Sequence, residues 1–418
     1  MERRKDRILL CLCHLSGNEQ KFVQEAFDTN WVVPLGPNVN GFEKDLETFV
    51  GQNKRVVALS AGTAAVHLGL LACGVGPGDE VCVQSFTFCA SSHPITYLGA
   101  TPVFIDSEKE TWNMDPELLE EAINDRIAKT GKKPKAIVPV ALYGMPYKID
   151  RIMEIANKYD IPVVEDAAEG FGSKFKGQVL GTFGKYGVLS FNGNKMITTS
   201  GGGALITASE DEWREIMMYA TQYRESYPYY QHEKIGYNYR MSNICAGIGR
   251  GQMTVVNDHI AHHKHVQKLY EELLKDVKGI TVHSQPATGE YDSNYWLCTM
   301  TLDPDLKVKG QENAYKQVIT GAVGGAAGVI HAASSAITDC QPNDNVEALR
   351  MLLDALNIES RPLWKPMHKQ PVYKNAPAYL NGVSEDLFKV GMCLPAGPYV
   401  TDEAVKYIVE AIKDSIIW

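Results

Sequence analysis

The chain lacks several features that would each have narrowed its class at once. No stretch approaches the roughly 18 apolar residues that a membrane-spanning helix needs, and the apolar run at residues 8–13 is too short for a signal peptide. Nine cysteines are scattered without the spacing of a disulfide framework, so we expect reduced thiols in a cytoplasmic protein. Cys11, Cys13 and His14 have no second ligand cluster after them, so no metal site is predicted. There are 41 basic and 50 acidic side chains, and this excess of negative charge argues against binding to nucleic acid or to an anionic membrane.

The length of 418 residues indicates two domains, a large one over 1–260 and a smaller one over 261–418. Short apolar runs alternate with helical patterns from residue 55 to about residue 206, and several runs are too apolar to be exposed on either face. This alternation predicts an α/β domain with a mostly parallel central sheet and helices on both faces. The runs are 55–60, 80–85, 101–106, 136–144, 161–167, 186–191 and 203–207.

The second domain is predicted to be α+β. Long helices over 245–276 lead out of the large domain, and the chain ends in a helix near 402–415. One segment, 310–344, is rich in glycine, alanine and serine, and we interpret it as an exposed insertion or a loop. The strand candidates are 280–284, 295–302 and 358–364.

Active sites of open α/β sheets lie beyond the carboxyl ends of the strands, and three strand ends here suit one cofactor. After the run 55–60, a turn of small residues opens a helix. Its first N–H groups, at Gly62, Thr63 and Ala64, favour an anion such as a phosphate. The alternative is an ordinary capped helix whose small residues allow close packing.

The other two strand ends carry a carboxylate and an amine. Asp166 ends a buried strand, where a carboxylate is costly unless it is paired. A protonated pyridine nitrogen would pair with it, and the alternative is a helix N-cap. Lys195 follows the run 186–191 in a turn of asparagine and glycine, 29 residues after Asp166 and shortly before the glycines 201–203. An amine beside a phosphate and a pyridinium can form a Schiff base and then move a proton, which predicts pyridoxal 5′-phosphate (PLP) as the cofactor.

Together these elements resemble the DegT-like sugar-nucleotide aminotransferases, which are PLP enzymes of fold type I. The motifs that carry the resemblance are SAGTAAVHLGL, GPGDEV, SFTFCASSHPI, GATPVFID, EDAAEGFGSKFKG, GTFGKYGVLSFNGNK, TTSGGGAL, IGYNYRMSN and RPLWKPMH. The resemblance is closest to enzymes of polysaccharide biosynthesis that aminate UDP-linked 2-acetamido-4-keto-2,6-dideoxy sugars. It implies glutamate as the amino donor.

The resemblance also assigns roles by position. It implies Lys195 as the Schiff-base lysine, Asp166 as the partner of the pyridine nitrogen, Thr63, Ala64 and Ser190 as phosphate contacts, and Phe88 as the ring that stacks on the cofactor. Asn238 would reach the phosphate of a neighbouring subunit, which makes a homodimer the smallest active unit. Glu169 stands beside the cofactor where many relatives have glutamine, and Ala141 stands where many have histidine.

Candidate substrate contacts are Asn30, Trp31, Arg240, Arg361, Lys365 and His368. The last four suit an anionic diphosphate or carboxylate, and each has a surface or interface charge as its alternative.

Three other functions stay open at this stage. A PLP-dependent sugar dehydratase would carry histidine in place of Lys195, so the lysine weighs against it. A different fold type I activity, such as a lyase that acts on sulfur amino acids, is the second alternative. The third is a protein that uses the fold for binding or regulation without catalysis.

Overall fold

The computed structural model describes residues 1–316 and 339–417, and it confirms the predicted α/β fold. Each of the seven apolar runs contains one strand of the large sheet. These strands are β1 (Arg55–Leu59), β2 (Glu80–Gln84), β3 (Thr101–Ile105), β4 (Ala136–Val138), β5 (Val164–Asp166), β8 (Tyr186–Ser190) and β9 (Gly203–Thr207).

The large sheet is mostly parallel. Hydrogen bonds give the strand orders β1-β9-β8-β5 and β15-β3-β2-β4, where β15 is Ala378–Tyr379. Two parallel bridges, Ile137 to Val163 and Val140 to Asp166, join β4 to β5 and so unite the two halves. Only β9 runs against its neighbours β1 and β8, while the other neighbouring strands named here are parallel.

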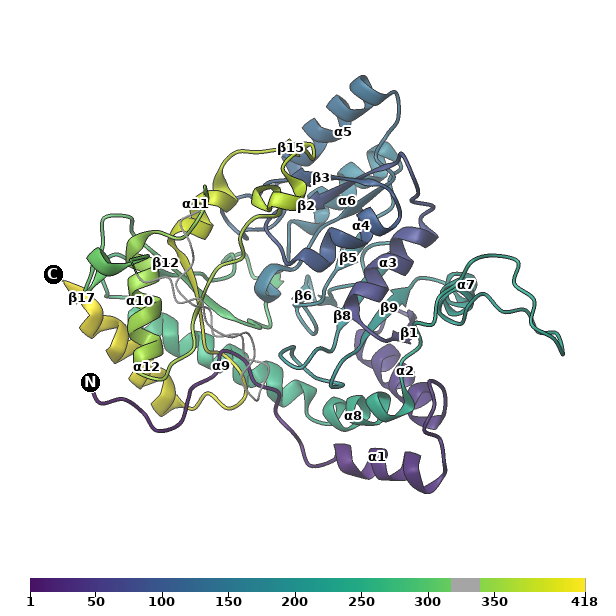
Figure 1. The fold of residues 1–418 in the computed structure, drawn as a ribbon, viewed down its shortest axis with the longest axis horizontal. Helices are drawn as coiled ribbons and strands as arrows, with labels where there is room; N and C mark the ends of the chain where they lie inside the picture. Colours follow the sequence, from purple (N-terminus) through teal and green to yellow (C-terminus); the bar gives the residue numbers. More distant parts are fainter. Residues whose placement is uncertain (317–338, 418) are drawn as a thin grey trace.

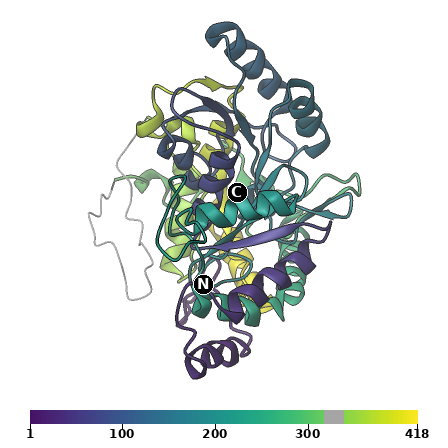
Figure 2. The same cartoon turned by 90° about the vertical axis from the view of Figure 1, so that its right-hand side faces the viewer.

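Helices cover both faces of this sheet because successive side chains of a strand point to opposite sides. In β1, Val57 and Leu59 pack with α3 and α7, whereas Val56 and Ala58 pack in a second cluster with α2, α5 and α6. In both views α1 and α5 lie at opposite ends of the molecule (Figures 1 and 2). These helices are α1 (Glu19–Asp28), α2 (Pro37–Val50), α3 (Gly62–Ala72), α5 (Pro116–Thr130), α6 (Ile149–Tyr159) and α7 (Glu210–Ala220).

The small domain is an antiparallel sheet with its own apolar core, as the α+β prediction requires. Its strand order is β10-β12-β16-β14, and α9, α10 and α12 pack on it around Leu302, Ile358 and Ile408. Both termini lie beside this domain (Figure 1). The elements are α9 (Val256–Leu274), β10 (Ile280–Val282), β12 (Cys298–Leu302), α10 (Asp344–Ala355), β14 (Arg361–Pro362), β16 (Gly391–Leu394) and α12 (Asp402–Ser415).

The domain boundary between residues 260 and 261 stays a prediction. It falls inside α9, and this helix packs in the cores of both domains. Ile260 packs in the core of the large domain, whereas Val266 and Tyr270 of the same helix pack in the core of the small one. Of the segment 310–344, residues 317–338 lie outside the described residues. Among the described residues, none of the helices combines the length and the apolar character that crossing a bilayer requires.

The remaining elements are shorter or lie at the edges. They are α4 (His93–Tyr97), α8 (Asn243–Met253), α11 (Val383–Val390), β6 (Lys174–Phe175), β7 (Gln178–Val179), β11 (Tyr291–Asp292), β13 (Lys307–Val308) and β17 (Ile416–Ile417).

Candidate active site

The carboxyl ends of β1, β8 and β5 meet at one edge of the large sheet. Because β9 runs the opposite way, its first residue, Gly203, lies at the same edge, opposite Leu59 and Ser190. Asp166 ends β5 and pairs with Val188 of β8. The three predicted strand ends therefore converge on one place, where a cavity of about 440 Å³ opens. Predicted residues that line it are Gly62, Thr63, Phe88, Asp166, Glu169, Ser190 and Lys195.

Glycine lets the helix α3 begin directly over this sheet edge. A Cβ atom on Gly203 would lie 2.4 Å from the backbone nitrogen of Gly62 and 2.5 Å from the carbonyl carbon of Ala61. A Cβ atom on Gly62 would in turn lie 3.0 Å from the Cβ of Ser190. The contacts at Gly203 are with backbone atoms and could not be relieved cheaply, so this glycine is needed to bring the start of α3 against β9.

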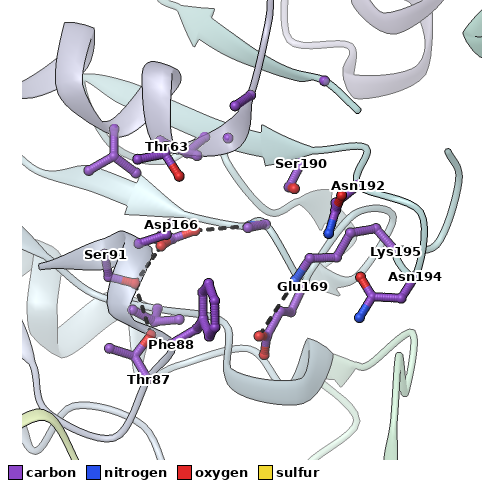
Figure 3. A pocket seen from close by; sticks show the side chains of 18 of the residues that line it. Thr63, Thr87, Phe88, Ser91, Asp166, Glu169, Ser190, Asn192, Asn194 and Lys195 are labelled. Atoms are coloured by element: carbon purple, nitrogen blue, oxygen red, sulfur yellow. Dashed lines mark hydrogen bonds and ion pairs between the residues drawn. The ribbon is translucent and has the colours of Figure 1, made fainter. Parts of the chain in front are cut away.

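The start of α3 has the features of an anion-binding site. Ala61 occupies the N-cap position, and no side chain caps the free N–H groups of the first turn. The hydroxyls of Thr63 and Ser190 both face this part of the cavity (Figure 3). Free amides, the positive end of the helix dipole and two hydroxyl donors together suit a phosphate group.

Asp166 lies at the bottom of the cavity with both carboxylate oxygens hydrogen-bonded. The Ser91 hydroxyl donates to Oδ2 at 2.6 Å, and the amide of Ala168 donates to Oδ1 at 3.1 Å. Burial raises the pKa of Asp166, while these two hydrogen bonds and the charge of Lys195 act in the opposite direction. Both hydrogen-bond donors are neutral, so a cationic ring nitrogen would supply the charge that they lack.

Lys195 reaches into the cavity from the turn after β8. The turn is fixed by a hydrogen bond from the Lys195 amide to the Asn192 carbonyl (2.9 Å) and by one from the Trp296 indole to the Asn194 carbonyl (2.6 Å). The ammonium group lies 4.0 Å from the centre of the Trp296 ring. The lysine is thus held in one place by its turn and by an aromatic wall.

Glu169 is the anionic partner of this lysine. Its Oε1 lies 3.6 Å from the Lys195 Nζ (Figure 3). Its Oε2 accepts a hydrogen bond of 2.6 Å from the Tyr143 amide. Burial raises the pKa of Glu169, and Lys195 opposes that shift. Tyr143 itself holds a left-handed backbone conformation (φ 54°), which is uncommon for a residue other than glycine.

Phe88 presents its ring to the cavity between Asp166 and Glu169 (Figure 3). The side chain is 50% exposed, and its ring centre lies 5.5 Å from that of Trp364. Because this apolar ring is half exposed beside two carboxylates, a flat ligand could stack on it.

Other predicted residues lie outside the lining of this cavity. Arg240 forms an ion pair with Glu43, and both side chains are almost fully buried. Asn238 pairs with Thr221 at the base of the loop that follows α7. Asn30 and Trp31 are exposed in the turn that follows α1, and Ala64 lies buried inside α3.

The candidate contacts near the C-terminus also have partners of their own. Arg361 forms an ion pair with Glu359 at 2.9 Å. The His368 ring bonds the Ser85 hydroxyl at 2.7 Å, and burial lowers the pKa of this histidine. Lys365 lies 3.9 Å from Asp339.

Several lining residues were missed by reasoning from the sequence. Ser91 and Thr87 stand in the motif SFTFCASSHPI, from which only Phe88 is predicted as a site residue. Hydroxyl groups that follow the end of a strand are the signal that could identify them as partners of Asp166. Trp296 and Trp364 come from segments far along the chain, and no local pattern connects them with Lys195.

Pyridoxal phosphate fits the residues that are present. The cavity offers an amine, a buried carboxylate, an uncapped helix start with two hydroxyls, and a half-exposed aromatic ring. Fold and site together define a PLP-dependent enzyme of fold type I.

The chain belongs to the DegT/DnrJ/EryC1/StrS aminotransferase family, whose pattern it matches over residues 14–323 and 311–413. It is 41% identical, over 97% of its length and 95% of the relative, to EpsN of Bacillus subtilis, a protein named as a pyridoxal phosphate-dependent aminotransferase. It is 34% identical to GDP-perosamine synthase of Escherichia coli O157:H7, over 96% of each chain. A DegT DnrJ EryC1 StrS aminotransferase from Brucella abortus has a similar structure, with a TM-score of 0.80, 27% identity and 95% of each chain covered. The protein is therefore a PLP-dependent sugar aminotransferase.

Proposed function

We propose that this enzyme moves the amino group of glutamate to a nucleotide-linked keto sugar, namely a UDP-2-acetamido-4-keto-2,6-dideoxy hexose. One observation carries the proposal: a lysine, a buried carboxylate and an uncapped helix start converge on a single cavity. All three features serve to hold pyridoxal phosphate, and membership of an aminotransferase family favours amino-group transfer over the other reactions of this cofactor.

Five residues of the cavity have tasks in this proposal. Pyridoxal phosphate supplies an electron sink for the carbon that loses its proton. Lys195 would hold the cofactor through its Nζ and, when released, carry a proton at the same atom. Asp166 would orient the ring through its nitrogen, and Glu169, 3.6 Å from the lysine, balances the ammonium charge. Thr63 and Ser190 would bind the phosphate.

The nucleotide and the sugar are the finer part of the proposal. The motif resemblance favours a UDP-linked 4-keto sugar, whereas one relative is named for a GDP-linked sugar. Small changes in a pocket decide between such substrates. Arg361, Lys365 and His368 flank Trp364, which lines the cavity, so we propose this segment as the binding region for the diphosphate. We retain Asn30 and Trp31 as proposed sugar contacts.

A homodimer with shared sites is part of the same proposal. The loop of residues 221–236 projects from the body of the molecule (Figure 1), and it carries exposed side chains such as Tyr230 (79%) and Ile235 (84%). Large apolar side chains on a projecting loop favour burial against another chain. Asn238, at the base of this loop, would then serve the neighbouring cavity. A cytoplasmic location also stays a prediction.

The test is a half-reaction followed by a full reaction. Purified enzyme loaded with cofactor is incubated with glutamate, and release of 2-oxoglutarate is measured. UDP-, GDP- and TDP-linked keto sugars are then supplied and the aminated sugar is detected by mass spectrometry. We expect turnover with the UDP sugar and none with Lys195→Ala. Release of 2-oxoglutarate without amination of any sugar would refute the proposed substrate class. The enzyme would then be an aminotransferase whose amino-group acceptor is not one of these keto sugars.

A mixing experiment tests the shared site. Lys195→Ala and Asn238→Ala subunits are each expected to be impaired as homodimers. A mixed dimer would contain one site with both native residues and would regain activity. Mixtures that stay as inactive as the separate variants, or a monomer by light scattering at full activity, would contradict the shared site.

A further inference from the structure

Two hydroxyl groups stand in line behind the Asp166 carboxylate. The Ser91 Oγ lies 2.6 Å from Asp166 Oδ2, and the Thr87 Oγ1 lies 2.8 Å from the Ser91 Oγ (Figure 3). Each of the three residues is 5% exposed or less. Bulk water cannot easily replace a hydrogen bond lost at this depth.

The direction of this chain of hydrogen bonds follows from the ionised carboxylate. A carboxylate has no proton to give, so Ser91 donates to Asp166 and its oxygen is free to accept. Thr87 is then the donor to Ser91. Each hydrogen bond polarises the next, so Thr87 strengthens the hydrogen bond that Ser91 makes to Asp166.

The same turn also places the aromatic ring of the cavity. Phe88 directly precedes the short 3₁₀ turn Cys89–Ser91, and the Ser91 amide donates to the Phe88 carbonyl at 3.3 Å. One five-residue stretch therefore fixes both the ring that faces the cavity and the hydroxyl that holds Asp166. A shift of this turn would move both together.

We propose that Ser91, supported by Thr87, is a positioning residue that keeps the Asp166 carboxylate ionised and turned toward the cofactor ring nitrogen. The inference rests on the proposed function, in which Asp166 pairs with that nitrogen. Without the Ser91 hydroxyl, the carboxylate keeps only the Ala168 amide and is more easily protonated. A protonated Asp166 would leave the ring nitrogen without its anion.

The test compares Ser91→Ala with a matched control, Ser92→Ala. Ser92 is the next residue and is equally buried, but its hydroxyl donates to the Cys89 carbonyl at 3.2 Å and not to Asp166. The first readout is the dissociation constant of pyridoxal phosphate, measured on the cofactor-free protein. We expect Ser91→Ala to raise it about tenfold, because a hydrogen bond to a charged group is lost. Ser92→Ala and the conservative Ser91→Thr should stay near the wild type.

The second readout is the pH at which the absorbance of the bound cofactor changes. A ring nitrogen with less positive charge withdraws less electron density from the group bound to Lys195. The midpoint should therefore move to higher pH in Ser91→Ala. Thr87→Val, which removes only the outer hydroxyl, should move both readouts in the same direction and by less.

The outcomes separate the two levels of the argument. A wild-type protein that takes up no pyridoxal phosphate would refute the proposed function and this inference with it. If the wild type binds the cofactor, but Ser91→Ala matches Ser92→Ala in both readouts, only the inference is wrong. A lower unfolding temperature with unchanged affinity and absorbance would show that Ser91 is merely structural. Should Ser91→Ala fail to fold, Thr87→Val and Ser91→Thr decide the question.

Discussion

Substitution of Arg240 should destabilise the protein in a way that depends on pH. Arg240 and Glu43 form an ion pair with side chains 9% and 10% exposed, and Glu43 also accepts a hydrogen bond of 2.8 Å from the Ala58 amide. Arg240→Met leaves the carboxylate buried without its cation. Its least costly response is to take up a proton.

The size of the effect follows from the cost of that proton. The ordinary pKa of a glutamate is 4.5, so pH 7 lies 2.5 units above it. Keeping Glu43 protonated at pH 7 therefore costs about 3.4 kcal/mol. At pH 5 the same change costs about 0.7 kcal/mol. The folded variant binds a proton that the unfolded chain releases, so its stability relative to the wild type falls as pH rises. Burial already raises the pKa of Glu43 in the native pair, which Arg240 opposes.

The assay is urea unfolding followed by tryptophan fluorescence at pH 5 and pH 7. Glu43→Gln is the complementary variant, because it leaves a buried arginine that cannot lose its proton and so gains no relief at low pH. The double variant Glu43→Gln/Arg240→Met should recover most of the stability. A penalty for Arg240→Met that is equal at both pH values, or additive costs in the double variant, would refute this reasoning. A raised KM for the sugar with normal stability would instead favour Arg240 as a substrate contact.

Three further outcomes are expected. Lys369 and Lys389 lower the pKa of Glu385 to about 2, so the ion pairs stabilise the wild type above pH 4.5 and this stabilisation is lost as the pH falls toward 2. Glu385→Gln should remove it, which is checked by measuring the unfolding temperature against pH. Gly203→Ala should block cofactor uptake and lower stability by a few kcal/mol, roughly the cost of overpacking a core. Gly193→Ala, where a Cβ meets nothing within 4 Å, is its control, and equal behaviour of the two would contradict the steric argument. Phe88→Ala should keep the unfolding midpoint, because half of the side chain is exposed, but weaken cofactor binding about fivefold in a fluorescence titration; an unchanged affinity would mean that the ring does not stack on the cofactor.

The sequence by itself determined the fold class and the main members of the site. Runs such as 55–60 and 186–191 are mostly apolar without a regular alternation of apolar and polar residues, which favours strands covered on both faces. Because parallel strands end at one edge, Asp166 and Lys195 could be expected together from their places after two such runs. The sequence shows the glycines 201–203, but it does not show the close approach of Gly203 to the backbone of Ala61 and Gly62.

Tertiary structure alone decided the partners of those residues. The ion pair between Arg240 and Glu43 joins residues nearly two hundred positions apart, and the sequence predicts Arg240 only as a substrate contact. Trp296 lies beside Lys195 in the cavity although the two residues are 101 positions apart in the sequence. Strand periodicity is a local property that a sequence records directly, whereas contacts between distant segments depend on how strands are ordered and domains are joined, which no local pattern encodes.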